Sequence, residues 1–305
     1  MSTLKRDHKP VSNIKRLFNC LICADSRGRG LNETTTKRKI LENLSAEERE
    51  KTGLEIEINV RPGAKLEDFA RFLDSHPKKA SIDFIIIIAG ICNLTTRTIN
   101  GSLKTLTYDK EDAVGNIKDY ISQSIEQYGR KFHIATITPA SLQKFNITHN
   151  SAAQLSKESL HRQNDQQESL TRDCNQLNDF IVEKNIEREC PTLRWAGQCM
   201  RSTKRRDRRT KKLRPATYRF DCKKLTDGVH PDDALRGTWF SLINRFVAEL
   251  IRREINPTTS YLSREPTQGT ETDSEESERE YEKYDFKRRK TAAASVHPVT
   301  FKVIL

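Results

Sequence analysis

The chain has 305 residues, of which 35% are hydrophobic and 31% charged, and its formal net charge is +12. This length can supply one large core or two small ones, while the polar composition indicates that part of the chain lies outside a core. The longest apolar run, Phe84 to Ala89, is far too short to span a bilayer, and no signal peptide precedes it. We therefore expect an intracellular protein, cytoplasmic or nuclear, with no membrane span; composition leaves its oligomeric state open.

Seven cysteines at irregular spacings favour a reducing compartment over a disulfide framework. Cys20 and Cys23 form a C-x-x-C pair, but both lie in a predicted strand. Side chains three residues apart in a strand point to opposite faces, so this pair is poorly placed to share a metal ion or a disulfide. We expect no metal site.

The predicted elements begin after a basic arm at residues 1–15. Several apolar stretches have the composition of strands, and one of them is apolar almost throughout, as a central parallel strand covered on both faces would be. The predicted strands are Leu17–Ala24, Leu54–Val60, Ile82–Ala89 and Lys131–Thr138, with a short fifth at Tyr218–Cys222.

Helical patterns lie between and after these strands. The clearest is the last, in which apolar residues from Leu235 to Ile251 recur at the 3.6-residue period. Earlier helices are predicted at Leu66–Leu73, Asp112–Tyr128 and Leu170–Glu189. Strands that alternate with helices predict a three-layer αβα domain over residues 16–256, built on a mostly parallel, five-stranded sheet.

Two segments differ in composition from this domain. Residues 257–305 are acidic and serine-rich, which predicts a disordered tail, with Ser274 and Ser277 as candidate phosphorylation sites and Lys287 to Lys290 as a candidate import signal. An insertion at 201–214 holds nine basic residues and one acid. It is either a solvated loop or a surface that binds nucleic acid or another polyanion. Its basic residues are Arg201, Lys204, Arg205, Arg206, Arg208, Arg209, Lys211, Lys212 and Arg214.

Four polar segments should meet beyond the carboxyl ends of the strands, where open α/β sheets bind ligands. Ser26 ends the first strand, and Asp227 and His230 lie three residues apart in a tight segment before the last helix. That spacing lets the carboxylate hold one imidazole nitrogen while the other faces a hydroxyl. Pro231 suits the first turn of the following helix. The pattern predicts a nucleophile, Ser26, a general base, His230, and an orienting acid, Asp227.

Other interpretations of this serine are open. A Rossmann phosphate loop would need a glycine where Glu33 stands and an acid at the end of the second strand, which ends instead in Asn59-Val60-Arg61. The stretch ADSRG nearly matches the G-x-S-x-G elbow of α/β-hydrolases, but that elbow follows several strands. A turn serine and a helix-capping histidine are ordinary features by themselves. Their appearance together in ordered segments favours a site.

These segments resemble the four blocks of the SGNH (GDSL-like) hydrolase family over about Leu17 to Arg253. The family's G-D-S appears as Ala24-Asp25-Ser26, its second-block glycine as Gly63, and its D-x-x-H as Asp227 to His230. The resemblance implies a flavodoxin-like fold with strand order 2-1-3-4-5. It also implies hydrolysis of a small ester or acylated substrate through an acyl-enzyme, without a cofactor, with the backbone N–H groups of Ser26 and Gly63 in the oxyanion hole.

The third block departs from the family pattern. Its G-x-N-D aligns with Gly90-Ile91-Cys92-Asn93, so the asparagine of the oxyanion hole falls on Cys92, a weak donor. Loss of one such donor typically costs about 10²–10³ in rate. Either a bulge brings Asn93 into the role, or the site is attenuated. Two functions follow: a serine esterase or deacylase, or a catalytically weak module that binds nucleic acid or another polyanion.

Overall fold

The computed structural model describes residues 15–109, 112–150, 157–203 and 217–257. The predicted basic arm, the basic insertion from Lys204 onward and the predicted tail lie outside the described residues, except for residues 15 and 257 at their borders.

A sheet of four parallel strands forms the centre of the fold, in the order β2-β1-β3-β6. Ala24 at the end of β1 pairs with Val60 on one side and Ile88 on the other, so three strands end at the same level. Their carboxyl ends therefore share one edge of the sheet, which places the segments that follow them side by side. The strands are β1 (Arg16–Ala24), β2 (Thr52–Val60), β3 (Phe84–Ile88) and β6 (Phe132–Ile134).

The prediction of a longer fourth strand is wrong, because β6 ends at Ile134 and not at Thr138. The backbone that follows finds partners outside the sheet: the N–H of Thr136 donates to a carbonyl in the segment after α7, and the N–H of Ile137 donates to the Asn178 side chain. Tertiary contacts from α7 (Lys157–Glu187) and from the segment after it thus replace the ladder.

The predicted fifth strand exists, but it does not join the central sheet. It is β8 (Thr217–Phe220), and it pairs with β7 (Met200–Thr203) in a separate two-stranded sheet. Residues 201–203 and 217–219 belong to a second structural unit. The central sheet therefore has four strands and not five, and its order matches the expected 2-1-3-4 for the strands it contains.

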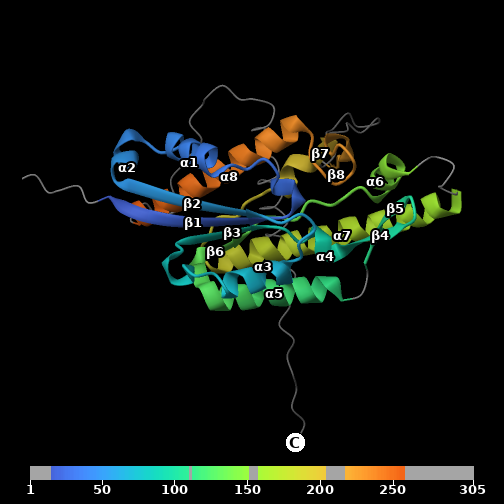
Figure 1. Cartoon of the computed structure of the whole chain (residues 1–305), viewed down its shortest axis with the longest axis horizontal. Helices are drawn as coiled ribbons and strands as arrows, with labels where there is room; N and C mark the ends of the chain where they lie inside the picture. The colour runs from blue at the N-terminus through green and yellow to red at the C-terminus, as the bar shows by residue number, and fades with distance from the viewer. Residues whose placement is uncertain (1–14, 110–111, 151–156, 204–216, 258–305) are drawn as a thin grey trace, which may run out of the picture. The chain divides into compact units, whose positions relative to one another are not determined.

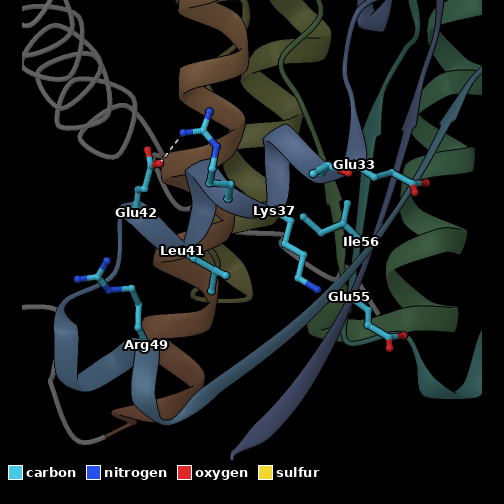
Figure 2. A pocket seen from close by; sticks show the side chains of 9 residues that line it. Glu33, Lys37, Leu41, Glu42, Arg49, Glu55 and Ile56 are labelled. Carbon is cyan, nitrogen blue, oxygen red and sulfur yellow. Dashed lines mark hydrogen bonds and ion pairs between the residues drawn. The ribbon is translucent and has the colours of Figure 1, made fainter.

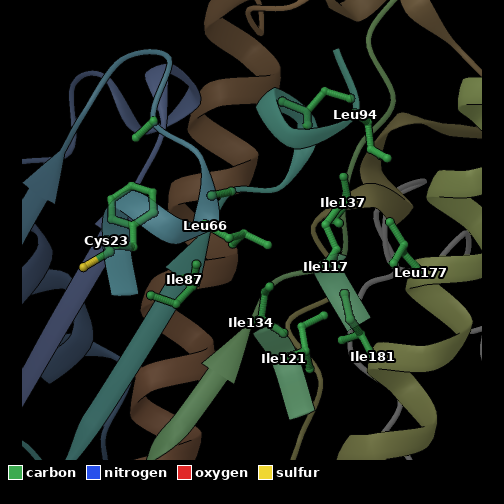
Figure 3. Close-up of a cluster of buried hydrophobic side chains, with 14 of the residues drawn as sticks. Cys23, Leu66, Ile87, Leu94, Ile117, Ile121, Ile134, Ile137, Leu177 and Ile181 are labelled. Atoms are coloured by element: carbon green, nitrogen blue, oxygen red, sulfur yellow. The ribbon is translucent and has the colours of Figure 1, made fainter. Parts of the chain in front are cut away.

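Helices cover both faces of this sheet, which confirms the three-layer αβα architecture (Figure 1). One face carries α1 (Glu33–Glu42) and α8 (Asp233–Ile255), whose apolar residues form one buried cluster with β1 and β3. The other face carries α3 (Leu66–Asp74), α5 (Ala113–Tyr128) and α7, which form the cluster shown in Figure 3. Cys20 belongs to the first cluster and Cys23 to the second, which confirms that they point to opposite faces.

The predicted helices are present, although α7 begins at Lys157, well before the predicted Leu170. None of the described helices is long and apolar enough to cross a membrane. Elements that the sequence patterns did not predict are α1, β7, α2 (Ala46–Glu50), α4 (Ile91–Leu94), α6 (Leu142–His149) and a hairpin of β4 (Thr95–Asn100) and β5 (Leu103–Tyr108).

The hairpin is attached to α6 by asparagine side chains. The Asn146 Oδ1 accepts from the N–H of Leu106 at 2.7 Å, and its Nδ2 donates to the carbonyl of Leu106 at 3.1 Å. Asn150 makes the same two bonds with Lys104. These amides stand where a neighbouring strand would be, and they hold α6 beside β5.

One buried residue of the sheet, His133, should make the stability of the folded state depend on pH. His133 on β6 is 2% exposed, its ring lies edge-on to Phe246, and neither ring nitrogen has a hydrogen-bond partner. Burial lowers the pKa of His133 to about 3, and the nearby Arg188 and Arg253 act in the same direction. In the unfolded chain its pKa returns to about 6.5. The unfolded state therefore binds more protons between these pH values, and stability falls as the pH drops below 6.5.

We expect a His133→Leu variant to lose less stability on acidification than the native chain. At pH 5, linkage with these pKa values predicts that His133 costs the native state about 2 kcal/mol relative to pH 8. The measurement is the free energy of unfolding in urea at both pH values for both proteins. An identical pH dependence in the two would show that His133 is not buried in its neutral form.

Candidate active site

The serine of the first segment lies in a turn that begins directly after β1. Ser26 opens the short 3₁₀ helix Ser26–Gly28, and the Asp25 carboxylate caps this turn by accepting from the N–H of Arg27 at 2.9 Å. A Cβ on Gly28 would lie 2.4 Å from the Cβ of Ala24, so the chain can turn back this closely only with glycine there. The tight turn leaves Ser26 at the carboxyl edge of the sheet.

The segment with the histidine is organised by its own aspartate. Asp227 Oδ1 accepts from the N–H of Val229 at 3.0 Å and of His230 at 2.8 Å, which closes a compact turn. Gly228 has φ +87°, and a Cβ there would lie 2.4 Å from the carbonyl oxygen of Ser141. The turn therefore needs glycine for its conformation and for its contact with the start of α6.

The three predicted side chains lie in hydrogen-bonding order. His230 Nε2 is 3.0 Å from Ser26 Oγ, and His230 Nδ1 is 2.8 Å from Asp227 Oδ2. Ser26 and His230 are 204 positions apart in the sequence. The structure thus brings together residues that the sequence placed in separate segments.

The electrostatics of the turn favour an ionised Asp227. Its side chain is 15% exposed, and burial acts to raise the pKa of this carboxyl. The hydrogen bonds from the His230 side chain and from the His230 and Val229 backbone outweigh burial, and hold the pKa of Asp227 well below its ordinary range. A carboxylate here can orient the imidazole and balance the charge of an imidazolium.

The helix after this turn begins slightly later than the sequence indicated. Pro231 was expected in the first turn, but α8 begins at Asp233, and Asp232 is its N-cap, with its carboxylate accepting from the N–H of Leu235. Pro231 instead pairs with Leu225 in an isolated β-bridge. The bridge closes the base of the turn that holds His230.

Gly63 lies in the turn after β2. The N–H of Arg61 donates to the carbonyl of Ala24 at 2.8 Å, which ties this turn to the end of β1 beside Ser26. Gly63 has φ +78°, a conformation that favours glycine. Within the described residues, the backbone N–H groups of Ser26 and Gly63 donate to no acceptor. Both are available for a ligand at this edge.

Asn93 and Cys92 lie at the start of α4, and the asparagine is already occupied. Asn93 Oδ1 accepts from the N–H of Leu66 at 3.0 Å, and its Nδ2 donates to the Glu67 carboxylate at 2.9 and 3.0 Å. These bonds hold the first turn of α3 and use both polar atoms of the Asn93 side chain. Cys92 is partly buried, and burial raises the pKa of its thiol to about 12. It is therefore a neutral thiol near pH 7.

Sequence patterns did not point to His149 as a neighbour of this site. It is the last residue of α6, and its Nε2 lies 3.5 Å from Asp227 Oδ2, the oxygen that contacts His230. Its ring also packs on Phe145 with centroids 4.3 Å apart. No local motif signals this approach, because it depends on the packing of α6 against the Asp227 turn.

Two cavities lie away from Ser26, Asp227 and His230. A cavity of about 730 Å³ lies beside the edge strand β2, between α1 and α2, and its lining carries both acids and bases, among them Glu33, Lys37 and Arg49 (Figure 2). A smaller one, of about 240 Å³, lies near His76. Neither includes Ser26, Asp227 or His230. Within the part of the chain that the structure describes, no three histidine, cysteine or acidic side chains are grouped to hold a metal ion.

The predicted polyanion-binding residues cannot be placed in the site. Lys204 to Arg214 lie outside the described residues, and of Arg201 only the backbone is described, in β7.

Comparisons with known proteins gave structural neighbours and no sequence relatives. No family model and no curated protein matches the sequence. The fold is similar to that of a lipase/acylhydrolase from Enterococcus faecalis, with a TM-score of 0.47 and 14% identity over 76% of this chain and 96% of that one. It is also similar to an acetyl xylan esterase from Geobacillus stearothermophilus, with a TM-score of 0.44 and 12% identity over 78% and 96%. A third similar structure is a GDSL-like lipase from Bacteroides thetaiotaomicron, with a TM-score of 0.39 and 13% identity over 77% and 88%. These similarities concern the backbone, so the chemistry must be inferred from the site itself.

Proposed function

We propose that residues 16–256 form a serine hydrolase domain of the SGNH type, which hydrolyses an ester through an acyl-enzyme. The observation that carries the proposal is the hydrogen-bonded series of Ser26, His230 and Asp227, at 3.0 and 2.8 Å. A serine in hydrogen-bonding contact with an imidazole that is itself oriented by a carboxylate is the arrangement that activates a hydroxyl for nucleophilic attack.

In the first half of the reaction, Ser26 Oγ attacks the carbonyl carbon of the ester while His230 Nε2 takes the hydroxyl proton. Asp227 keeps the Nδ1 proton of His230 directed toward itself and stabilises the imidazolium that forms. The C–O bond to the alcohol then breaks, the alcohol leaves with the proton from His230, and the acyl group stays on Ser26.

In the second half, a water molecule gives a proton to His230 as its oxygen attacks the acyl carbon. The bond to Ser26 Oγ breaks, the oxygen regains a proton from His230, and the carboxylic acid is released. The overall reaction consumes one ester and one water, and it yields an acid and an alcohol. It requires no cofactor.

The negative oxygen of each tetrahedral intermediate needs donors. The N–H groups of Ser26 and Gly63 are suited to this role, because they belong to turns held together by the Arg61–Ala24 bond and have no other partner among the described residues. A third donor is missing where the family pattern has asparagine, since Cys92 offers a weak S–H and Asn93 is bonded to α3. We infer an attenuated hole with two backbone donors.

A fluorophosphonate probe tests the proposal without knowledge of the substrate. We expect the native chain to be labelled at Ser26, identified by peptide mass spectrometry, and Ser26→Ala to lose the label. Ser75→Ala, which removes an exposed serine hydroxyl bonded to the backbone of α3, should keep full labelling. A native chain that stays unlabelled, or a Ser26→Ala variant that is still labelled at the same rate, would refute an activated Ser26.

A second function rests on the basic insertion. We propose that residues 201–214 bind nucleic acid, because nine basic residues and one acid occur within these fourteen positions. Binding of single-stranded RNA should weaken steeply with salt, and should be lost when the nine residues are changed to glutamine. Neutralising Lys287 to Lys290 is the matched control and should change binding less. Absence of binding at low salt would refute this function and leave the esterase proposal unaffected.

A further inference from the structure

The residue after the serine is a buried cation. Arg27 is 3% exposed, although it carries a guanidinium group. Its Nη1 donates to the carbonyl of Thr138 at 2.6 Å, its Nη2 to that of Pro139 at 3.4 Å, and its Nε to that of Val229 at 3.1 Å. Its own backbone N–H donates to the Asp25 carboxylate. The side chain is thus bonded to two distant segments while its backbone is held in the Ser26 turn.

These partners are the segments that must be aligned for the proposed reaction. Val229 lies between Asp227 and His230 in the turn that presents the imidazole. Thr138 and Pro139 lie between β6 and α6, the helix whose start contacts Gly228. The bonds from Arg27 span 202 positions to Val229 and 111 to Thr138. One side chain therefore links the nucleophile turn directly to the histidine turn and to the segment that supports it.

A buried acid, Asp25, lies beside the serine in the same turn and is 1% exposed. Burial raises the pKa of its carboxyl, while the positive charge of Arg27 and the hydrogen bond from the Arg27 backbone N–H act to lower it. Removing Arg27 would leave three carbonyl oxygens without their donor and a buried carboxylate without its nearby cation. The buried carboxylate and the three carbonyl oxygens therefore require a positively charged side chain at this position, and one with several N–H donors.

We propose that Arg27 is a positioning residue for the Ser26–His230 pair, setting their separation by holding the Val229 carbonyl against the Ser26 turn. This inference rests on the proposed serine hydrolase function. The serine is carried by β1 and the histidine by the turn before α8, so their 3.0 Å contact depends on how these two elements are joined. The bond between Arg27 and Val229 joins them within one residue of each partner.

Arginine is suited to this task in a way that lysine is not. Its planar guanidinium has five N–H donors in a fixed arrangement, so it can serve the carbonyls of Thr138, Pro139 and Val229 together. A lysine ammonium is a compact group on a flexible stem, and it cannot span both segments. Arg27→Lys therefore keeps the buried charge and removes the bridge.

The test compares Arg27→Lys with Arg188→Lys. Arg188 also donates to backbone carbonyls, those of Gly129 and Phe132, but it lies away from the site. With p-nitrophenyl acetate as the probe substrate, Arg27→Lys should lower kcat about 10²-fold with little change in KM, because misplaced reacting groups affect the chemical step and not ground-state binding. Arg188→Lys should leave kcat close to the native value. Methylguanidinium should restore part of the rate of Arg27→Ala, and methylammonium should not.

A second measurement is independent of catalysis. The backbone N–H groups of Val229 and His230 are bonded to Asp227, and their hydrogen exchange should become at least about tenfold faster in Arg27→Lys, with exchange in β1 and β3 unchanged. If the native chain neither hydrolyses the ester nor reacts with fluorophosphonate, the proposed function fails, and exchange still decides whether Arg27 orders the turn. Native kcat and native exchange in Arg27→Lys would overturn the inference. Faster exchange throughout the sheet would also overturn it, since Arg27 would then be a general stabiliser.

Discussion

Replacing Asp227 with asparagine should lower kcat for ester hydrolysis by about 10⁴-fold while the fold is retained. The asparagine oxygen can still accept from the N–H groups of Val229 and His230, so the turn can close. Its amide nitrogen then faces His230 Nδ1 and donates to it. The imidazole proton is forced onto Nε2, where it faces Ser26 Oγ and prevents His230 from accepting the serine proton.

The measurement is steady-state hydrolysis of p-nitrophenyl acetate, together with the rate of fluorophosphonate labelling, which should fall in parallel. Asp232→Asn is the matched control, since it makes the same chemical change five residues away at the N-cap of α8. Asparagine caps helices as well as aspartate does, so this control should keep native stability and native rate. Equal rates in Asp227→Asn and the native chain would show that the carboxylate does not orient a catalytic imidazole.

Replacing Cys92 with asparagine should raise kcat, by up to about 10²–10³-fold if the new amide reaches the oxyanion. The native residue is a neutral thiol, because burial raises its pKa to about 12, and an S–H group is a weak donor. An amide N–H at this position would add the donor that the two backbone groups lack. The gain should be found in kcat and not in KM, because the oxyanion exists only at and near the transition state.

Cys92→Ala separates this explanation from others. If Cys92 contributes little now, alanine should leave kcat nearly unchanged, whereas a large loss would show that the thiol is itself an important donor. Asn93→Ala should destabilise the fold through the lost bonds to Leu66 and Glu67, without a specific loss of kcat. No gain in Cys92→Asn, in a variant as stable as the native chain, would contradict an attenuated hole.

Continuous and periodic apolar patterns in the sequence predicted most of the fold. The apolar run before Ala89 is the buried central strand β3, and the stripe from Leu235 to Ile251 is the buried side of α8. Both patterns arise because one side or both sides of an element must face a core. The spacing of apolar residues that this requires lies within the element itself, so it can be recognised in the sequence. The hairpin β4–β5 was not predicted from the sequence, although its two-residue loop, Gly101-Ser102 between polar, β-branched segments, is a signal for such a turn.

The fourth strand is shorter than predicted for a different reason. Lys131 to Thr138 has the composition of one strand throughout, but only Phe132–Ile134 pairs with β3. The N–H of Ile137 bonds to Asn178, a residue on a helix more than forty positions away. Whether a strand-like segment stays in the sheet depends on which partners the rest of the fold brings to it, and composition does not contain that information.

In the candidate active site, too, some features could be predicted from local sequence and others depend on tertiary contacts. From the sequence we predicted that a serine follows a buried strand and that an aspartate and a histidine share one tight turn. These features can be predicted because the end of a strand and a glycine turn depend on residues that are neighbours in the chain. The folded structure was needed to show that these segments meet, that His149 approaches Asp227, and that the Asn93 side chain is hydrogen-bonded to α3. It also revealed the bridge from Arg27 to Val229. Such contacts depend on how α6, α8 and the sheet pack together, because they join residues that are far apart in the sequence and become neighbours only when the chain folds.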